Sequence, residues 1–170
     1  MSFDFSTLVT DRSQADLDTL RALLAVPLED WTAEQLAEFN QATSKGAYNY
    51  TDLNRVTACM DYLYQEFSEL GYSMPMYLQD ASIENEGCIP TDQEMKQYIT
   101  NLLSLRSALK MLQKTPESPK NMSKLNYLMA NDIEKILYDI NQLIIALSNV
   151  FIRSGMIWAV SGGENFQFIN

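Results

Sequence analysis

Apolar residues recur at spacings of three and four along most of this chain, which is the period of amphipathic α-helices. The clearest series comprises Leu53, Val56, Met60, Leu63 and Phe67, and it extends over several helical turns. Helix-start residues, together with proline and glycine as stops, divide the pattern into four main helices and one short helix. The main helices are expected over about 11–25, 51–70, 91–113 and 126–155, and the short one over about 32–45.

The last predicted helix has the widest apolar stripe in the chain, so it should lie at the centre of the core. This stripe comprises Ile133, Ile136, Leu137, Ile140, Leu143, Ile144, Leu147, Val150 and Phe151. Gly155 should end the helix. The predicted fold class is mainly α: a helical bundle of four main helices plus one short helix, with a small C-terminal β-hairpin or arm.

Both ends of the chain depart from the helical period. Residues 1–9 have no helical spacing and are expected to form an arm or an added strand. Residues 156–170 combine a short alternation, the Gly162-Gly163 pair and two phenylalanines, which favours a β-hairpin or paired arm. A lone hairpin is marginal in water, so it should pack on the bundle or pair with another chain. The expected division is an arm over 1–9, a bundle domain over 10–155 and a β arm over 156–170.

Four predicted helix starts share one chemistry, a capping residue followed by an aspartate. They are Thr10-Asp11, Thr51-Asp52, Thr91-Asp92 and Asn131-Asp132. Their spacing allows an internal duplication, with halves 10–90 and 91–155. The alternative is that helix starts in general prefer these residues.

Composition excludes several classes of function. The 170 residues carry a net charge of −10, which repels phosphate backbones and anionic lipids, so neither nucleic acid nor a membrane is an expected partner. The chain has no histidine, which excludes Ser-His-Asp and Cys-His catalysis. No metal or other cofactor is expected, and Gly162-Gly163 lacks a phosphate-loop context. Cys59 and Cys88 should be reduced, buried thiols, although a disulfide stays possible.

Carboxylates are numerous, and they are expected on solvated helix faces and in first turns. The set comprises Asp52, Asp61, Glu66, Glu69, Glu84, Glu86, Asp132, Glu134 and Asp139. No pair of them falls on a predicted apolar face, where burial could raise a pKa. No catalytic residue is therefore predicted, but spacing alone leaves a two-carboxylate hydrolase open.

Aromatic residues are the candidate binding groups. Tyrosines gather between residues 48 and 77, and three interpretations stay open: packing at the rim of the core, a protein interface, or a platform for sugars. The two terminal arms add further aromatic and apolar residues. The predicted partner-binding residues are Phe3, Phe5, Tyr48, Tyr50, Tyr62, Tyr72, Trp158, Val160, Phe166 and Phe168.

Several segments resemble a family of uncharacterised prophage proteins of Gram-positive bacteria. They are Thr10-Asp-Arg-Ser-Gln-Ala-Asp16, Lys45-Gly-Ala-Tyr-Asn-Tyr-Thr-Asp-Leu-Asn-Arg-Val56, Leu70-Gly-Tyr72, Ile89-Pro-Thr-Asp-Gln-Glu-Met95 and Ala130-Asn-Asp-Ile-Glu-Lys-Ile-Leu137. The likeness spans roughly residues 10–165, and only the connector 80–87 and the end 166–169 depart from it. Members of this family are met among phage tail and baseplate genes, so the resemblance implies a virion component and supplies no catalytic residue.

The expected function is that of a non-enzymatic structural protein of the phage tail, baseplate or fibre, which acts by protein–protein docking. It would be assembled in the bacterial host cytoplasm and reside in the virion, with other virion proteins or copies of itself as partners. Both terminal arms would bury apolar residues against neighbouring subunits, and strand addition by the C-terminal arm would supply main-chain hydrogen bonds between them. The alternative is a receptor- or carbohydrate-binding module that contacts a host cell-surface glycan, and a third possibility is an acidic cell-wall hydrolase.

Overall fold

The computed structural model describes the backbone of residues 2–76 and 90–165, and the side chains of this part up to residue 150. Five α-helices follow one another: α1 (Gln14–Leu24), α2 (Ala33–Asn40), α3 (Tyr50–Glu69), α4 (Asp92–Ala108) and α5 (Tyr127–Asn165). Two 3₁₀ turns, η1 (Phe5–Thr7) and η2 (Leu28–Asp30), complete the order. The prediction of a mainly helical protein with four main helices and one short helix is confirmed.

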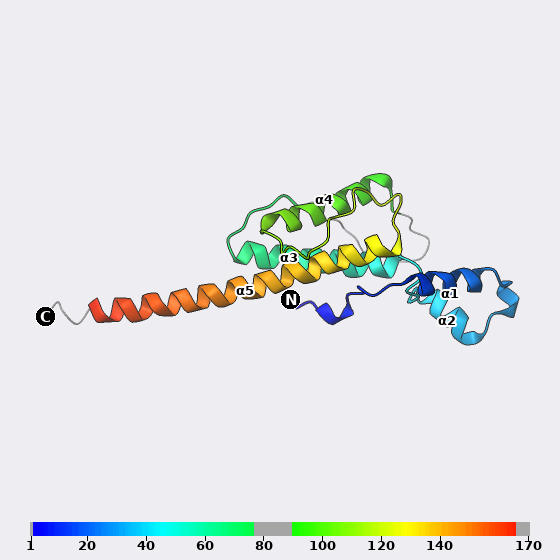
Figure 1. The fold of residues 1–170 in the computed structure, drawn as a ribbon, viewed down its shortest axis with the longest axis horizontal. Helices are drawn as coiled ribbons and strands as arrows, with labels where there is room; N and C mark the ends of the chain where they lie inside the picture. Colours follow the sequence, from blue (N-terminus) through cyan, green and yellow to red (C-terminus); the bar gives the residue numbers. More distant parts are fainter. Residues whose placement is uncertain (1, 77–89, 166–170) are drawn as a thin grey trace.

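The core lies between α3, α4 and α5, which pack against one another (Figure 1). The apolar stripes of these helices meet there, which confirms the predicted central place of the last helix over its first half. The buried apolar side chains are Val56, Cys59, Met60, Leu63, Phe67, Tyr98, Ile99, Leu102, Leu105, Ile133, Ile136, Leu137, Ile140 and Ile144. Burial of this apolar surface supplies the main stabilising free energy of the bundle.

Reciprocal capping boxes begin α1, α2, α3 and α4. At α3 the cap is Asn49 rather than the predicted Thr51: the Asn49 side chain accepts from the Thr51 amide, and Asp52 accepts from the Asn49 amide. The predicted start was therefore two residues late. α4 ends at Ala108, about five residues before the predicted end, and Leu112, which the prediction placed within the helix, is exposed.

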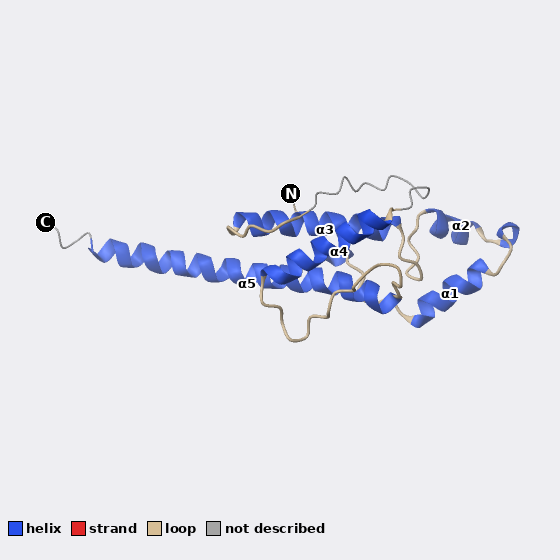
Figure 2. Ribbon diagram, turned by 90° about the horizontal axis from the view of Figure 1, so that it is seen from above, coloured by secondary structure: helices blue, strands red, loops and turns tan. Residues whose placement is uncertain are grey.

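The prediction that the last helix ends at Gly155 and a β-hairpin follows is not supported. α5 is one helix of 39 residues that continues to Asn165 and projects beyond the bundle (Figures 1 and 2). Extending an existing helix adds one hydrogen bond for each residue fixed, whereas a new hairpin must form a turn and two marginal strands. Each glycine costs only about 1 kcal/mol in a helix interior. Residues 166–170 lie outside the described part.

α1 and α2 form a helical hairpin (residues 14–40, the α1–α2 hairpin) at the opposite end of the molecule from the last turns of α5 (Figure 1). No residue of either helix is buried. This differs from α4, which contributes four apolar residues to the core. The two halves of the proposed duplication thus have different surroundings: α1 lies on the periphery and α4 in the core.

We predict that Leu102→Ala lowers the free energy of unfolding by about 2–5 kcal/mol, because Leu102 is fully buried and a cavity would be left in the core. Its neighbour Leu103 is 47% exposed on the same helix and is the matched control, for which Leu103→Ala should cost less than about 1 kcal/mol. Urea unfolding followed by circular dichroism measures both, and equal losses would contradict the placement of the α4 stripe.

Candidate functional site

A cluster of four charged side chains joins the N-terminal segment to α3 and α5. One guanidinium nitrogen of Arg12 lies 2.7 Å from Asp52 Oδ1 and 2.8 Å from Glu134 Oε1. Arg55 contacts the same two carboxylate oxygens from the α3 side. We refer to Arg12, Asp52, Arg55 and Glu134 as the ion cluster. Its two positive and two negative charges cancel, so a low-polarity interior can hold it.

Main-chain groups of the N-terminal segment complete this arrangement. The Val9 amide donates to Glu134 Oε2 at 2.6 Å, and an Arg12 guanidinium nitrogen donates to the Val9 carbonyl at 2.7 Å. Asn131 on α5 accepts from the Arg12 amide at 3.0 Å and donates to the Arg12 carbonyl at 2.8 Å. These hydrogen bonds to α5 side chains therefore hold the N-terminal segment along α5. They take the place of the strand pairing that was one expectation for this segment.

The prediction of solvated carboxylates is wrong for three residues. Glu134 is fully buried, and Asp52 and Asp139 are nearly so. Their partners explain this, because Arg12 reaches Asp52 and Glu134 from far away in the sequence, and Thr115 donates to Asp139 at 2.7 Å. The sequence contained one signal that Glu134 is buried: it lies within the apolar series of the last helix, next to Ile133.

The geometry of the ion cluster gives it a structural role. Both oxygens of Asp52 and both of Glu134 accept hydrogen bonds from groups of this chain. Neither carboxylate presents a free oxygen to a substrate, whereas glycoside hydrolysis needs an acid and a base that flank the bond to be broken. Cys59 is a free, buried thiol, and burial raises its pKa far above the usual range, so it is a poor nucleophile. Cys88 lies outside the described residues.

Tyr48 connects the ion cluster to the core. Its hydroxyl lies 2.6 Å from the hydroxyl of Tyr98, and the Arg12 guanidinium stands 5.3 Å from the centre of its ring. Burial raises the pKa of both tyrosines well above the usual value. The phenol groups thus stay neutral and serve as a hydrogen-bonded pair inside the protein.

Other predicted binding aromatics also pack on their own chain. Phe3 and Phe5 meet edge to face and both contact the ring of Tyr62, with centroids 5.0–6.5 Å apart. Tyr72 contacts Phe67 of the core at 5.6 Å. Phe3, Phe5 and Tyr62 thus form an aromatic contact between the N-terminal segment and α3, and each of the predicted residues Phe3, Phe5, Tyr62 and Tyr72 is partly buried.

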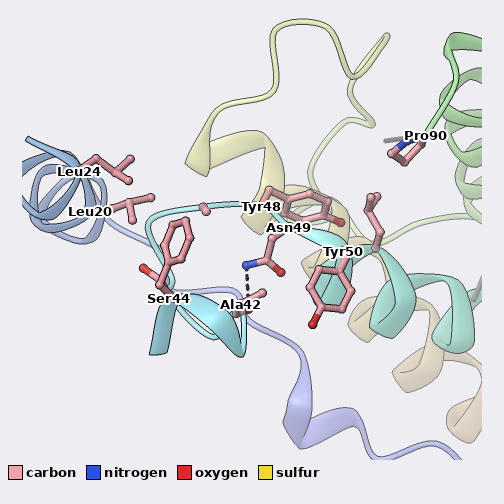
Figure 3. A pocket seen from close by; sticks show the side chains of 11 residues that line it. Leu20, Leu24, Ala42, Ser44, Tyr48, Asn49, Tyr50 and Pro90 are labelled. Atoms are coloured by element: carbon pink, nitrogen blue, oxygen red, sulfur yellow. Dashed lines mark hydrogen bonds between the residues drawn. The ribbon is translucent and has the colours of Figure 1, made fainter. Parts of the chain in front are cut away.

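Tyr50 and the edge of Tyr48 line a groove at the base of the α1–α2 hairpin (Figure 3). Its volume is about 550 Å³, and Leu20 and Leu24 of α1 form its far wall. The Asn49 side chain lies on its floor and donates to the Ala42 carbonyl at 2.7 Å. The lining is thus mostly apolar, as in sites that receive an apolar side chain or a helix.

Gly46 sets the close approach of α1 to the loop beside this groove. A Cβ at Gly46 would lie 2.5 Å from the Asp16 carbonyl oxygen and 2.7 Å from Leu20 Cβ. After α2 it is Ala42, and not Gly46, that has a positive φ, of 51°. Glycine is needed at 46 for space rather than for conformation.

The sequence missed a set of exposed apolar residues on and around the α1–α2 hairpin. Each exposes between 41% and 63% of its surface: Leu24, Val26, Leu28, Leu36 and Phe39. We call them the hairpin patch. A signal for this exposed set was available in the sequence. Two short amphipathic helices separated by Pro27 have apolar faces that are too small to form a core of their own. Large exposed apolar groups gathered in one region are typical of protein contact surfaces.

The four remaining predicted residues lie near the C-terminus. Trp158 and Val160 belong to the helical backbone of α5, and their side chains are outside the described part. Phe166 and Phe168 lie outside the described residues altogether. The prediction that these four bind a partner stays a prediction.

Two further classes of site have no candidate in the part that the structure describes. No group of three or more possible metal-ligating residues lies together there. Over the same residues, no helix combines the length and apolarity that crossing a membrane requires.

Comparisons with family models, with curated proteins and with solved structures find no match to this chain. Its function must therefore be argued from its own residues.

We predict that Arg12→Met destabilises the protein by about 3–5 kcal/mol, because it leaves the buried carboxylates of Asp52 and Glu134 with one guanidinium between them. The matched control is Arg21→Met, since Arg21 is an exposed residue of α1 that pairs only with the exposed Asp18. This change should stay within about 0.5 kcal/mol. Denaturant unfolding measures both, and similar losses would show that the ion cluster contributes no more than a surface pair.

We also predict a strong coupling between Tyr48 and Tyr98. Tyr48→Phe or Tyr98→Phe alone leaves one buried hydroxyl without its partner and should cost about 1–3 kcal/mol. The double variant removes both hydroxyls and should be about as stable as either single variant or more so. A double-mutant cycle from urea unfolding gives the coupling free energy, and strictly additive losses would mean that the hydroxyls do not pair.

Proposed function

We propose that this chain is a non-enzymatic structural protein of a phage virion, in the tail, baseplate or fibre region. It works by docking to other virion proteins and to copies of itself, after assembly in the bacterial host cytoplasm. Two supports are independent of each other: the resemblance of segments over residues 10–165 to phage tail-region proteins, and the apolar surface at the two ends of the molecule.

The observation that carries docking as the mode of action is the hairpin patch. Large apolar side chains such as Leu24 and Leu28 are more than half exposed there, on helices that have no buried residue of their own. Covering a fully exposed leucine is worth about 1.5–3 kcal/mol, so a partner surface gains free energy from even a few of them. The groove beside Tyr50 extends this surface toward α3.

A non-enzymatic role is supported by the way the buried acids are used. Arg12 and Arg55 bridge Asp52 and Glu134, which suits a rigid joint and not a reacting pair. This makes the third possibility, an acidic cell-wall hydrolase, the least supported.

The alternative function, a receptor- or carbohydrate-binding module, depends on tyrosines that share one open surface. The hydroxyl of Tyr48 pairs with Tyr98, and the ring of Tyr62 contacts Phe3 and Phe5. These side chains are occupied by internal contacts, which favours the interpretation of rim-of-core packing for them. Tyr50 is left as a groove residue, and one ring is a small platform for a sugar.

The proposal is tested by particle incorporation of the full-length chain. Particles are induced in the host and purified on a density gradient, and we expect the protein in them at a fixed stoichiometry. Leu24→Asp with Leu28→Asp should lower incorporation at least about tenfold, because charges in the hairpin patch oppose its burial. Quantitative immunoblotting against a known virion protein measures the ratio.

The control pair is Leu103→Asp with Leu112→Asp, at residues that are exposed to a similar degree but lie outside the hairpin patch. This variant should be incorporated like the wild type. A wild-type chain that never enters particles contradicts the proposed function. Equal incorporation of all three proteins would keep a virion role and reject the hairpin patch as its docking surface.

A further inference from the structure

The second half of α5 extends past α3 and α4, the helices that its first half packs against (Figures 1 and 2). Among the side chains of α5 that the structure describes, Ile144 is the last buried one, and from there the helix leaves α3 and α4 behind (Figures 1 and 2). We call residues 145–165 the distal α5 segment. Its 21 residues make a rod of about 31 Å at 1.5 Å per residue.

The apolar character of α5 does not stop where the bundle stops. Ile145 is 48% exposed and Val150 is 62% exposed. The series that begins with the core residues Leu137 and Ile144 continues at seven-residue spacing with Phe151 and Trp158. The seam that contacts α3 and α4 in the bundle is thus repeated along the helix where α3 and α4 are absent.

Apolar residues of the distal α5 segment are not confined to this one seam. Residues 150–152 and 156–160 are uninterrupted apolar runs, so apolar residues occur at positions all around the helix. A helix that is apolar all round is normally enclosed by other elements. In water a single helix of this kind is marginal, so other helices should surround it.

We infer that copies of this chain associate through their distal α5 segments, which form a bundle of helices between the copies. The inference names a partner, another copy of the chain, and it does not depend on the proposed role in a virion. Every copy presents the same repeated seam, so pairing two segments covers both surfaces at once, as in other homo-oligomers.

The charge distribution supports copies of the chain as the occupant. Arg153 and Glu164 are the only charged residues of the distal α5 segment, and they cancel. The whole net charge of −10 therefore belongs to the rest of the chain. Two copies repel each other over their bundles, and the distal α5 segment, which has no net charge, is the part that they can bring together.

The area of this surface sets the expected size of the assembly. A rod about 31 Å long and 10–12 Å wide offers roughly 600 Å² of accessible surface on one half. Two copies would bury roughly 1,200 Å², the lower limit of a stable interface. A bundle of three or more helices covers two sides of each one, and this suits a segment with apolar residues all round.

A lipid bilayer fits the distal α5 segment less well. Arg153 lies near the middle of its 21 residues, where a charged residue costs about 2.5–3.5 kcal/mol in a membrane. Asn149, Ser154 and Ser161 add further polar groups along it. In a bundle of helices such groups can face a partner helix or water.

The test compares the mass of the purified full-length chain with that of two double variants, by light scattering on a sizing column and by sedimentation equilibrium. Ile145→Glu with Val150→Glu introduces charges at exposed positions that the core does not use. The wild type should have at least twice the 19.4 kDa mass of one chain. The variant should have the mass of one chain, with a dissociation constant raised by at least about hundredfold.

The matched control is Leu128→Glu with Tyr138→Glu, two residues of similar exposure on the first half of the same helix. It adds the same charge and should keep the wild-type mass. Circular dichroism and urea unfolding check that all three proteins retain the folded bundle. A control that dissociates like the test variant would overturn the inference, because charge alone would then explain the result.

Two other outcomes overturn the inference. One is a wild-type chain that has the mass of a single chain at concentrations up to hundreds of micromolar. The other is a single chain that floats with neutral phosphatidylcholine vesicles, which would make a membrane the occupant of the distal α5 segment. Because these measurements use no phage particle, they can fail while particle incorporation succeeds, or the reverse.

Discussion

Arg12 lies where the N-terminal segment, α3 and α5 meet, and its charge is shared between Asp52 and Glu134. Removing two carboxylates and two guanidinium groups from water costs several kcal/mol per ion, and close contacts must compensate that cost. On the carboxylate side the cluster meets this condition, because main-chain and side-chain donors occupy all four oxygens, whereas Arg12 Nε is buried and has no hydrogen-bond partner among the described residues. The positions of the N-terminal segment and of the α3 start depend on this compensation.

The consequences of the ion cluster reach the surface through Tyr48. The ring of Tyr48 lies under the Arg12 guanidinium, its hydroxyl pairs with Tyr98 of α4, and its edge lines the groove beside the α1–α2 hairpin. A buried charge network therefore fixes one wall of an apolar surface groove. The N-terminal segment that contains Arg12 leads directly into α1. The ion cluster therefore anchors the base of the α1–α2 hairpin to the core, although no residue of α1 is itself buried there.

The residues that stabilise the fold and the exposed apolar residues available to other proteins lie in different parts of the molecule. Its stability resides in the middle, where α3, α4 and the first half of α5 bury their apolar stripes. Exposed apolar side chains occur singly on the middle helices, such as Leu103 and Leu128, whereas several lie together in the hairpin patch and an apolar sequence continues along the distal α5 segment. An elongated protein with this division can attach at both ends without disturbing its own core, which is a property expected of a component of a larger assembly.

The sequence by itself determined the helices, because helical spacing and capping residues are local signals. The stripes of Leu63, Leu102 and Ile140 and the cap at Thr91 were all readable from it. Tertiary structure alone decided the fate of Glu134, since its partner Arg12 is 122 residues away and no local pattern links them. It also decided the roles of the aromatic residues, because the contact of Phe5 with Tyr62 requires the N-terminal segment to lie along α3. The end of α5 shows the limit of local reading: an alternation of apolar residues fits a strand in isolation, but next to an existing helix the cooperative extension of that helix wins.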